Sequence, residues 1–374
     1  MGGIRLPQWV KQEIPATNAV VEPGQDADGD GEIQNGDGFV VKDVSGSIIA
    51  GRDVKVNIQG VSPLEHAKAL AQIEILREKL AIAEAANKEE PTPEEIRAAE
   101  DAIGAAGELQ GMGAIIDSWD LIKLGDAAIL QGLTFTAEGY YRESLRRFIA
   151  SGNQKGEAKS LNSLGKISWR RSDYGESERF FHESLVIARE IGDRRGESNS
   201  LNNLGNIADT RGDYDSAERL FIESLAIKRE IRDHKGQASS LNNLGNIADT
   251  RGDYESAEGF YRESLAIRRE IGDREGESRS LGNLGVMAHR RGDLDEVEKL
   301  TLESLAIQRE IGDRSSEANS LNNLGVSAMS RSDLDEAESL FRESLAIGRE
   351  IGDRKSEASS LNNLGNIFRR REDY

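Results

Sequence analysis

The chain has 374 residues, of which 37% are hydrophobic, with a formal charge of −19 and no cysteine. This acidic balance argues against a nucleic-acid partner, because nucleic-acid binding depends on clustered Lys and Arg. The lack of cysteine excludes disulfides, thiolate metal sites and thiol chemistry. The amino terminus lacks the apolar core of a secretory signal, and no apolar run approaches the roughly 20 residues of a membrane span. We therefore expect a cytoplasmic protein without a membrane partner.

Residues 1–37 are expected to be extended and contain an acidic segment, DADGDGEIQNGD, with the spacing of a calcium-binding loop. The candidate ligands are Asp26, Asp28, Asp30, Glu32 and Asp37. Asp37 stands where such loops carry a longer Glu, and Pro23 and Gly24 do not suit an entering helix. Two interpretations stay open: a calcium loop without flanking helices, which makes calcium the one cofactor candidate, and a flexible acidic linker.

Residues 38–61 are rich in Val and Ile with Gly between them, which predicts a segment of two or three short strands. So few strands cannot shield their own edges. We expect them to pair with the same element of another subunit or to pack on the rest of the chain.

Residues 62–114 are expected to be a helical connector. A first helix is predicted from about Pro63 to Ala86, and a second one begins after a capping box formed by Thr92 and Glu95. The first helix carries an apolar stripe that includes Ile73 and Leu80 at heptad spacing. Together with the unshielded strands, this stripe predicts a homo-oligomer.

The rest of the chain, residues 115–374, is a repeat array. The pattern Leu-x-x-Leu-Gly begins at Leu161, Leu201, Leu241, Leu281, Leu321 and Leu361, so the period is 40 residues. A degenerate copy starts at Leu121. These copies predict six full repeats followed by the first helix of another.

Each repeat predicts two helices joined by a turn, which we call helix A and helix B. In the second copy, Leu201, Leu204 and Gly205 share one face of helix A. Gly212 suits a left-handed helix end, and Asp213 can cap helix B. Ala217, Phe221, Leu225 and Ile231 are expected to face inward on helix B, and Glu218, Arg219, Lys228 and Arg229 to face solvent.

The pattern of Leu201, Leu204, Gly205, Ala217 and Phe221 resembles the tetratricopeptide repeat. The longer 40-residue unit is similar to the Leu-Gly-Asn repeat proteins and to kinesin light chains. This resemblance implies a mainly α fold: a right-handed α-solenoid of helix pairs, with a small β-rich and helical N-terminal region ahead of it.

In the resembling family, certain positions of helix A line a concave groove that holds extended peptides. Carried over to this chain, they are Asn162, Asn202, Asn206, Asn242, Asn246, Asn322, Asn362 and Asn366. A side-chain amide offers both a donor and an acceptor, so this ladder could pair with the backbone of a peptide of any sequence. The alternative is that Asn persists because the repeats were duplicated recently.

We find no catalytic constellation in the sequence, because His66, His182, His234 and His289 fall in different units without a nucleophile or ligand spacing. The leading hypothesis is a non-enzymatic scaffold that binds a protein or extended peptide. Two alternatives stay open. One is a structural protein that forms a filament by head-to-tail stacking of repeats, and the other is a regulatory subunit of a separately encoded effector.

Overall fold

The computed structural model describes residues 47–50, 54–57, 63–85, 91–111 and 115–372. The candidate calcium ligands Asp26 to Asp37 lie outside these residues. The described residues form three short strands and fifteen helices. The elements are β1 (Ser47–Ala50), β2 (Val54–Asn57), α1 (Pro63–Ala85), α2 (Pro93–Gly111), β3 (Ile115–Ile116), α3 (Ser118–Leu130), α4 (Thr134–Ser151), α5 (Gln154–Arg170), α6 (Tyr174–Glu190), α7 (Arg194–Thr210), α8 (Tyr214–Glu230), α9 (His234–Thr250), α10 (Tyr254–Glu270), α11 (Arg274–Arg291), α12 (Leu294–Ile311), α13 (Arg314–Ser330), α14 (Leu334–Ile351) and α15 (Arg354–Glu372).

The three strands form one antiparallel sheet in the order β1, β2, β3. Residue Val54 of β2 stands opposite Ile116 of β3, which directly precedes the first helix of the array. The sequence argument left open whether these strands pair with a second subunit or within the chain. β3 supplies a partner within the chain, so β2 is a central strand.

The apolar stripe of α1 packs inside the chain. Ile73, Leu76 and Leu80 are at most 3% exposed and belong to one core cluster with Leu109 of α2 and Leu124 of α3. The stripe is therefore not available for a coiled coil with a second subunit, and this part of the argument for an oligomer fails.

Within each repeat, helix A and helix B meet at a glycine and an aromatic ring. A Cβ atom built on Gly205 of α7 would lie 2.6 Å from a ring carbon of Phe221 on α8. This close approach requires glycine, and the ring of Phe221 is 1% exposed and packs with the buried Leu241 and Leu244 of the next helix A. The glycine of the repeated Leu-Gly pair is thus a contact between the two helices.

The turns between helices follow the expected chemistry. Gly212 has a φ of 76°, in the left-handed region, and Asp213 Oδ1 accepts the N–H of Ser216 at 3.1 Å. Arg232 takes the same left-handed conformation with a φ of 55°, at a position where most repeats have glycine. The left-handed turn residue and the capping Asp of each repeat therefore determine where one helix ends and the next begins.

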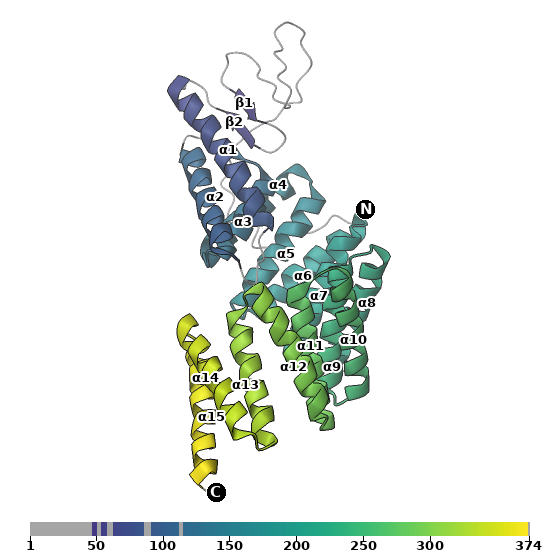
Figure 1. Ribbon diagram of the computed structural model, residues 1–374. Coiled ribbons are helices and arrows are strands. Elements are labelled where there is room, and N and C mark those ends of the chain that lie inside the picture. The colour runs from purple at the N-terminus through teal and green to yellow at the C-terminus, as the bar shows by residue number, and fades with distance from the viewer. Residues whose placement is uncertain (1–46, 51–53, 58–62, 86–90, 112–114, 373–374) are drawn as a thin grey trace.

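The helix pairs stack in sequence order from α3 to α15, and Figure 1 shows this succession from teal to yellow. The predicted fold class is confirmed: the chain is a right-handed α-solenoid with a small sheet and two helices ahead of it. On α15, Leu361 and Phe368 are 47% and 53% exposed, whereas Leu201 at the position equivalent to Leu361 is 1% exposed. No helix among the described residues combines the length and apolar character needed to cross a membrane.

Candidate peptide-binding groove

The groove is defined here as the face of the A helices α5, α7, α9, α11, α13 and α15 that carries the predicted asparagines. These side chains differ in exposure along the array. Asn162 is buried, Asn202, Asn206, Asn242, Asn322 and Asn366 are half-buried, and Asn246 and Asn362 are exposed. A bound peptide could therefore reach some of these asparagine side chains and not others.

Hydrogen bonds between asparagines of neighbouring repeats engage four of these eight asparagines as acceptors. The donor is the second residue of the Asn-Asn or Gly-Asn pair in the following repeat. Asn203 Nδ2 donates to Asn162 Oδ1 (3.5 Å), Asn243 Nδ2 to Asn206 Oδ1 (3.4 Å), Asn283 Nδ2 to Asn242 Oδ1 (2.8 Å) and Asn363 Nδ2 to Asn322 Oδ1 (3.0 Å). These donors were not among the predicted groove residues, although their own 40-residue repetition was a signal that could have identified them.

These hydrogen bonds change which atoms of the asparagines are available to a ligand. Asn242 Oδ1 accepts from Asn283, and Asn202 Oδ1 accepts from Lys228 Nζ at 3.3 Å and from Ser240 Oγ at 3.4 Å. Across the described part of the chain, the Nδ2 atoms of Asn202 and Asn242 have no hydrogen-bond acceptor. The prediction that each amide offers a donor and an acceptor therefore needs correction, because these two present mainly donors.

A basic hollow of about 340 Å³ adjoins Asn202, lined also by Lys166, Lys228 and Lys235. Lys228 is only 3% exposed, and its Nζ donates to Ser240 Oγ at 2.9 Å. Burial lowers the pKa of Lys228 to about 8, while the nearby charge of Asp233 acts in the opposite direction. The prediction that Lys228 faces solvent is wrong, because this position of helix B points between two A helices.

Two arginines in the later part of the groove are engaged with neighbouring groups. Arg290 of α11 forms an ion pair with Asp249 of α9, with 3.0 Å between Nε and Oδ1, and its guanidinium lies over the ring of Tyr254. At the end of the array, Arg370 donates to the carbonyl of Met329 at 3.1 Å.

The described residues contain no group of three or more His, Asp or Glu side chains that could hold a metal ion. The candidate calcium ligands of residues 1–37 are outside that search and stay a prediction.

Paired helices of one length, a glycine against a ring, and a 40-residue period define a helical repeat protein. The tetratricopeptide repeat family matches residues 156–230, 201–270, 236–310 and 316–374, so the chain belongs to this family. This match confirms the resemblance inferred from Leu201, Gly205 and Phe221. No curated protein matches the chain.

Several solved structures are similar to this chain. A signal transduction ATPase with numerous domains and a tetratricopeptide repeat sensor, from Pyrococcus horikoshii, has 14% identity and a TM-score of 0.62, over 83% of this chain and 47% of the other. A Rap protein complexed with competence and sporulation factor has 15% identity and a TM-score of 0.50, over 82% and 98%. A putative kinesin light chain repeat protein of Podosopora anserina has 17% identity and a TM-score of 0.44, over 52% and 96%. At these identities the likeness concerns the fold alone.

Proposed function

We propose that the array is a non-enzymatic scaffold that binds an extended peptide or protein segment along its groove. The observation that carries this proposal is the pair of oriented amides on Asn202 and Asn242. Their oxygens are engaged within the array, so their N–H groups are held in place for the carbonyl groups of a bound backbone. Little side-chain entropy is then lost on binding, because these amides are already ordered.

The basic hollow beside Asn202 adds a preference for negative charge. Lys166 and Lys235 line it together with Lys228, whose ammonium group is already bonded to Ser240. We infer that an acidic residue of the bound segment lies here. The chain itself is strongly acidic, so a local basic site would also orient such a segment along an otherwise repulsive surface.

The Rap protein supports the proposal at the level of the fold, since its structure is a complex with competence and sporulation factor. We also propose that the protein acts in the cytoplasm, a location that only the sequence suggests.

The test selects ligands from a random peptide library on phage, with the full chain as bait, and measures the affinity of selected peptides by calorimetry. Asn202→Asp and Asn242→Asp keep the acceptor oxygens and remove the N–H donors. The double variant should weaken binding by about 5- to 150-fold, as expected for two hydrogen bonds of about 0.5–1.5 kcal/mol each.

The matched control is Ala266→Asp, which adds a negative charge on the exposed surface of α10, outside the groove. It should leave the affinity unchanged. If the library yields no peptide, or if the double variant binds as tightly as the unmodified chain, the groove does not bind backbone in this way.

The two alternatives from the sequence stay predictions. The exposure of Leu361 and Phe368 on α15 is what a head-to-tail filament would cover. Electron microscopy of the purified chain, with Leu361→Asp and Phe368→Asp as variants, tests this. Leu364 is left unchanged because it is 8% exposed and packs with Phe341 and Ile367 in the core. Light scattering tests the prediction of a homo-oligomer. This prediction no longer draws support from the apolar stripe of α1, and only the rest of the N-terminal region remains as its basis. The hypothesis of a regulatory subunit awaits identification of an effector.

A further inference from the structure

One repeat lacks the aromatic ring that separates helix A from helix B in the others. The ring and its glycine are paired as Gly125 with Tyr141, Gly165 with Phe181, Gly205 with Phe221, Gly245 with Tyr261, and Gly325 with Phe341. In the remaining repeat, the residue opposite Gly285 is Thr301, and a Cβ atom built on Gly285 would meet nothing closer than its Oγ1 at 4.0 Å. The space that a ring fills elsewhere is therefore open here.

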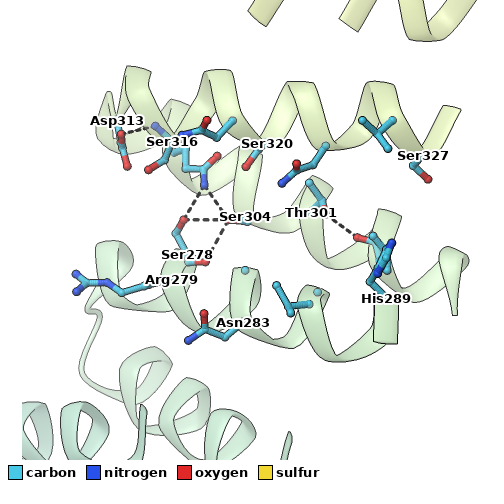
Figure 2. Close-up of a pocket in the computed structure, with 18 of the residues that line it drawn as sticks. Ser278, Arg279, Asn283, His289, Thr301, Ser304, Asp313, Ser316, Ser320 and Ser327 are labelled. Atoms are coloured by element: carbon cyan, nitrogen blue, oxygen red, sulfur yellow. Dashed lines mark hydrogen bonds between the residues drawn. The ribbon is translucent and has the colours of Figure 1, made fainter. Parts of the chain in front are cut away.

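The open space is part of a pocket of about 710 Å³. Figure 2 shows it between α11 and α13, with Thr301 and Ser304 of α12 projecting between the two helices. This volume is within the usual range for sites that bind small ligands or side chains. The exposed Val286 and Val326 lie at its edge, at positions where Asn206 and Asn246 stand in other repeats, so the pocket opens on the groove.

The pocket has one apolar side, and most of its other lining residues are polar. Leu294 and Val297 of α12 line one side. Ser327 of α13 is 6% exposed and takes the place of an isoleucine or methionine that is buried in the other repeats, such as Ile247. Gln308 of α12 is 5% exposed. Two departures from the repeat, Thr301 and Ser327, thus meet in one pocket.

Two oxygen atoms in this interior have no hydrogen-bond partner among the described residues: Gln308 Oε1 and Ser327 Oγ. The amide nitrogen of Gln308 is satisfied, since it donates to Ser278 Oγ at 3.1 Å and to Ser304 Oγ at 3.0 Å (Figure 2). A buried polar atom without a partner is unfavourable, and a ligand with a hydroxyl group could supply one after small rotations of these side chains.

The charged residues at the rim are already engaged with neighbours. Arg279 donates to Glu275 at 2.6 Å, and Asp313 caps α13 by accepting the N–H of Ser316 at 2.8 Å. The interior of the pocket is therefore neutral. It favours an uncharged group with an apolar body over a lysine, an arginine or a carboxylate.

We propose that this pocket takes a tyrosine side chain of the bound segment, whose ring replaces the one missing at Thr301. The inference rests on the proposed peptide-binding function and names an anchor residue for it. Tyr141 and Tyr261 show that a phenol fits the equivalent slot, and the hydroxyl of Tyr261 donates to Asn246 Oδ1 at 2.7 Å. Val286 occupies the position of Asn246 here, so a ring that enters from the groove must direct its hydroxyl inward, toward Ser327.

A phenol suits the unpartnered Ser327 Oγ because its hydroxyl both donates and accepts. The amide of Gln308 is bonded to Ser278 and Ser304, at the other end of the pocket from Ser327, so it is not a partner for the same hydroxyl (Figure 2). A phenylalanine would fill the space and leave Ser327 Oγ unpartnered, and an indole could only donate.

The test uses N-acetyl-tyrosinamide as the probe, with N-acetyl-phenylalaninamide and N-acetyl-leucinamide for comparison, in saturation-transfer NMR titrations of the full chain. Thr301→Phe supplies the missing ring and should reduce binding of the tyrosine probe by about tenfold or more. Thr301→Val keeps the space and is the matched control, since the Thr301 hydroxyl bonds only within α12, to the Val297 carbonyl at 2.7 Å.

We expect the tyrosine probe to bind the unmodified chain and Thr301→Val alike, and more tightly than the phenylalanine probe. Ser327→Ile should reduce that preference. Equal binding of the tyrosine probe to Thr301→Phe, equal binding of the tyrosine and phenylalanine probes, or no binding up to the solubility limit would each overturn the proposal.

Failure of this inference is distinguishable from failure of the groove proposal. The small probes do not need Asn202 or Asn242, so the double Asp variant should bind them as the unmodified chain does. Library peptides that depend on the asparagines while the tyrosine probe does not bind would leave the groove proposal intact and remove the anchor.

Discussion

Lys228 makes the stability of the array depend on pH in a direction that can be worked out. The buried ammonium group has a pKa of about 8 in the folded chain, against 10.5 for a lysine in water. Between these two values the unfolded chain binds more protons than the folded one, so the free energy of unfolding rises with pH across this window. Below about pH 8 both states are protonated, and the full cost of burying the charge is present.

The size of this effect follows from the two pKa values. A gap from about 8 to 10.5 corresponds to about 3 kcal/mol at about 1.36 kcal/mol for each pH unit. Lys228→Met keeps the length of the side chain and removes the charge. It loses the hydrogen bonds to Ser240, at 2.9 Å, and to Asn202, at 3.3 Å, which together offset the gain by about 2 kcal/mol. Near neutral pH the variant should therefore be more stable by about 1 kcal/mol.

The assay is urea unfolding followed by far-UV circular dichroism, for Lys228→Met, the unmodified chain and the exposed control Lys235→Met. Other titrating groups are common to all three proteins, so the difference between unfolding curves isolates Lys228. The advantage of Lys228→Met should shrink steadily as the pH rises from about 8 to about 10.5. A difference that does not vary with pH, or one that grows, would refute the assignment of a buried, charged lysine.

Three further predictions concern stability and use the same unfolding assay. Arg232→Gly should stabilise the array by about 1 kcal/mol, because it relieves a left-handed residue with a φ of 55°, and a loss of stability would contradict this. Gly205→Ala should destabilise by about 1–3 kcal/mol, since the new Cβ would meet the Phe221 ring at 2.6 Å; a neutral result would show that the ring moves freely. Glu277→Gln should cost about 1–3 kcal/mol, because Glu277 is 4% exposed and accepts from Arg269 Nε at 2.9 Å, and unchanged stability would mean that this ion pair contributes nothing.

The architecture of the repeats could be predicted from the sequence because it depends on local chemistry that recurs. The glycine at 212, the capping Asp213 and the Leu-Gly contact of Gly205 each act within one helix pair, and forty-residue repetition shows each of them several times. An error at one copy is corrected by the next. This is why the fold class and the family followed from residue spacing.

The charges were harder to place because helix B has more than one buried face. Lys228 and Arg229 are neighbours in a run that looks like a solvated end of a helix, yet Lys228 is buried and Arg229 is exposed and bonds Glu263 at 2.6 Å. The equivalent positions hold Ala188, Arg268, Gln308 and Gly348, which share no polarity. A position whose residue varies this much gives no periodic signal, so only packing against the next A helix reveals its burial.

Hydrogen bonding within the ladder posed a different problem. The sequence shows which asparagines occur, whereas the use of each amide depends on the neighbour that approaches it. The oxygen of Asn242 accepts from Asn283, which lies 41 residues later. The donor is therefore one position beyond the residue that is equivalent to Asn242 in the next repeat. Side-chain pairing between repeats therefore decides whether an amide is free to bind a ligand.

The pocket at Thr301 is partly visible in the sequence and partly a result of packing between repeats. It also shows why a solenoid preserves such a site. The missing ring is visible in the sequence as one departure from an otherwise regular aromatic position. In a globular core, elements from distant parts of the chain could move in to reduce the resulting space. In a solenoid each repeat packs only on its neighbours, so α11 and α13 are held by the repeats on either side, and the space of the missing ring remains open as part of the pocket between them. The regularity of the array is thus what allows one irregular repeat to keep an open site.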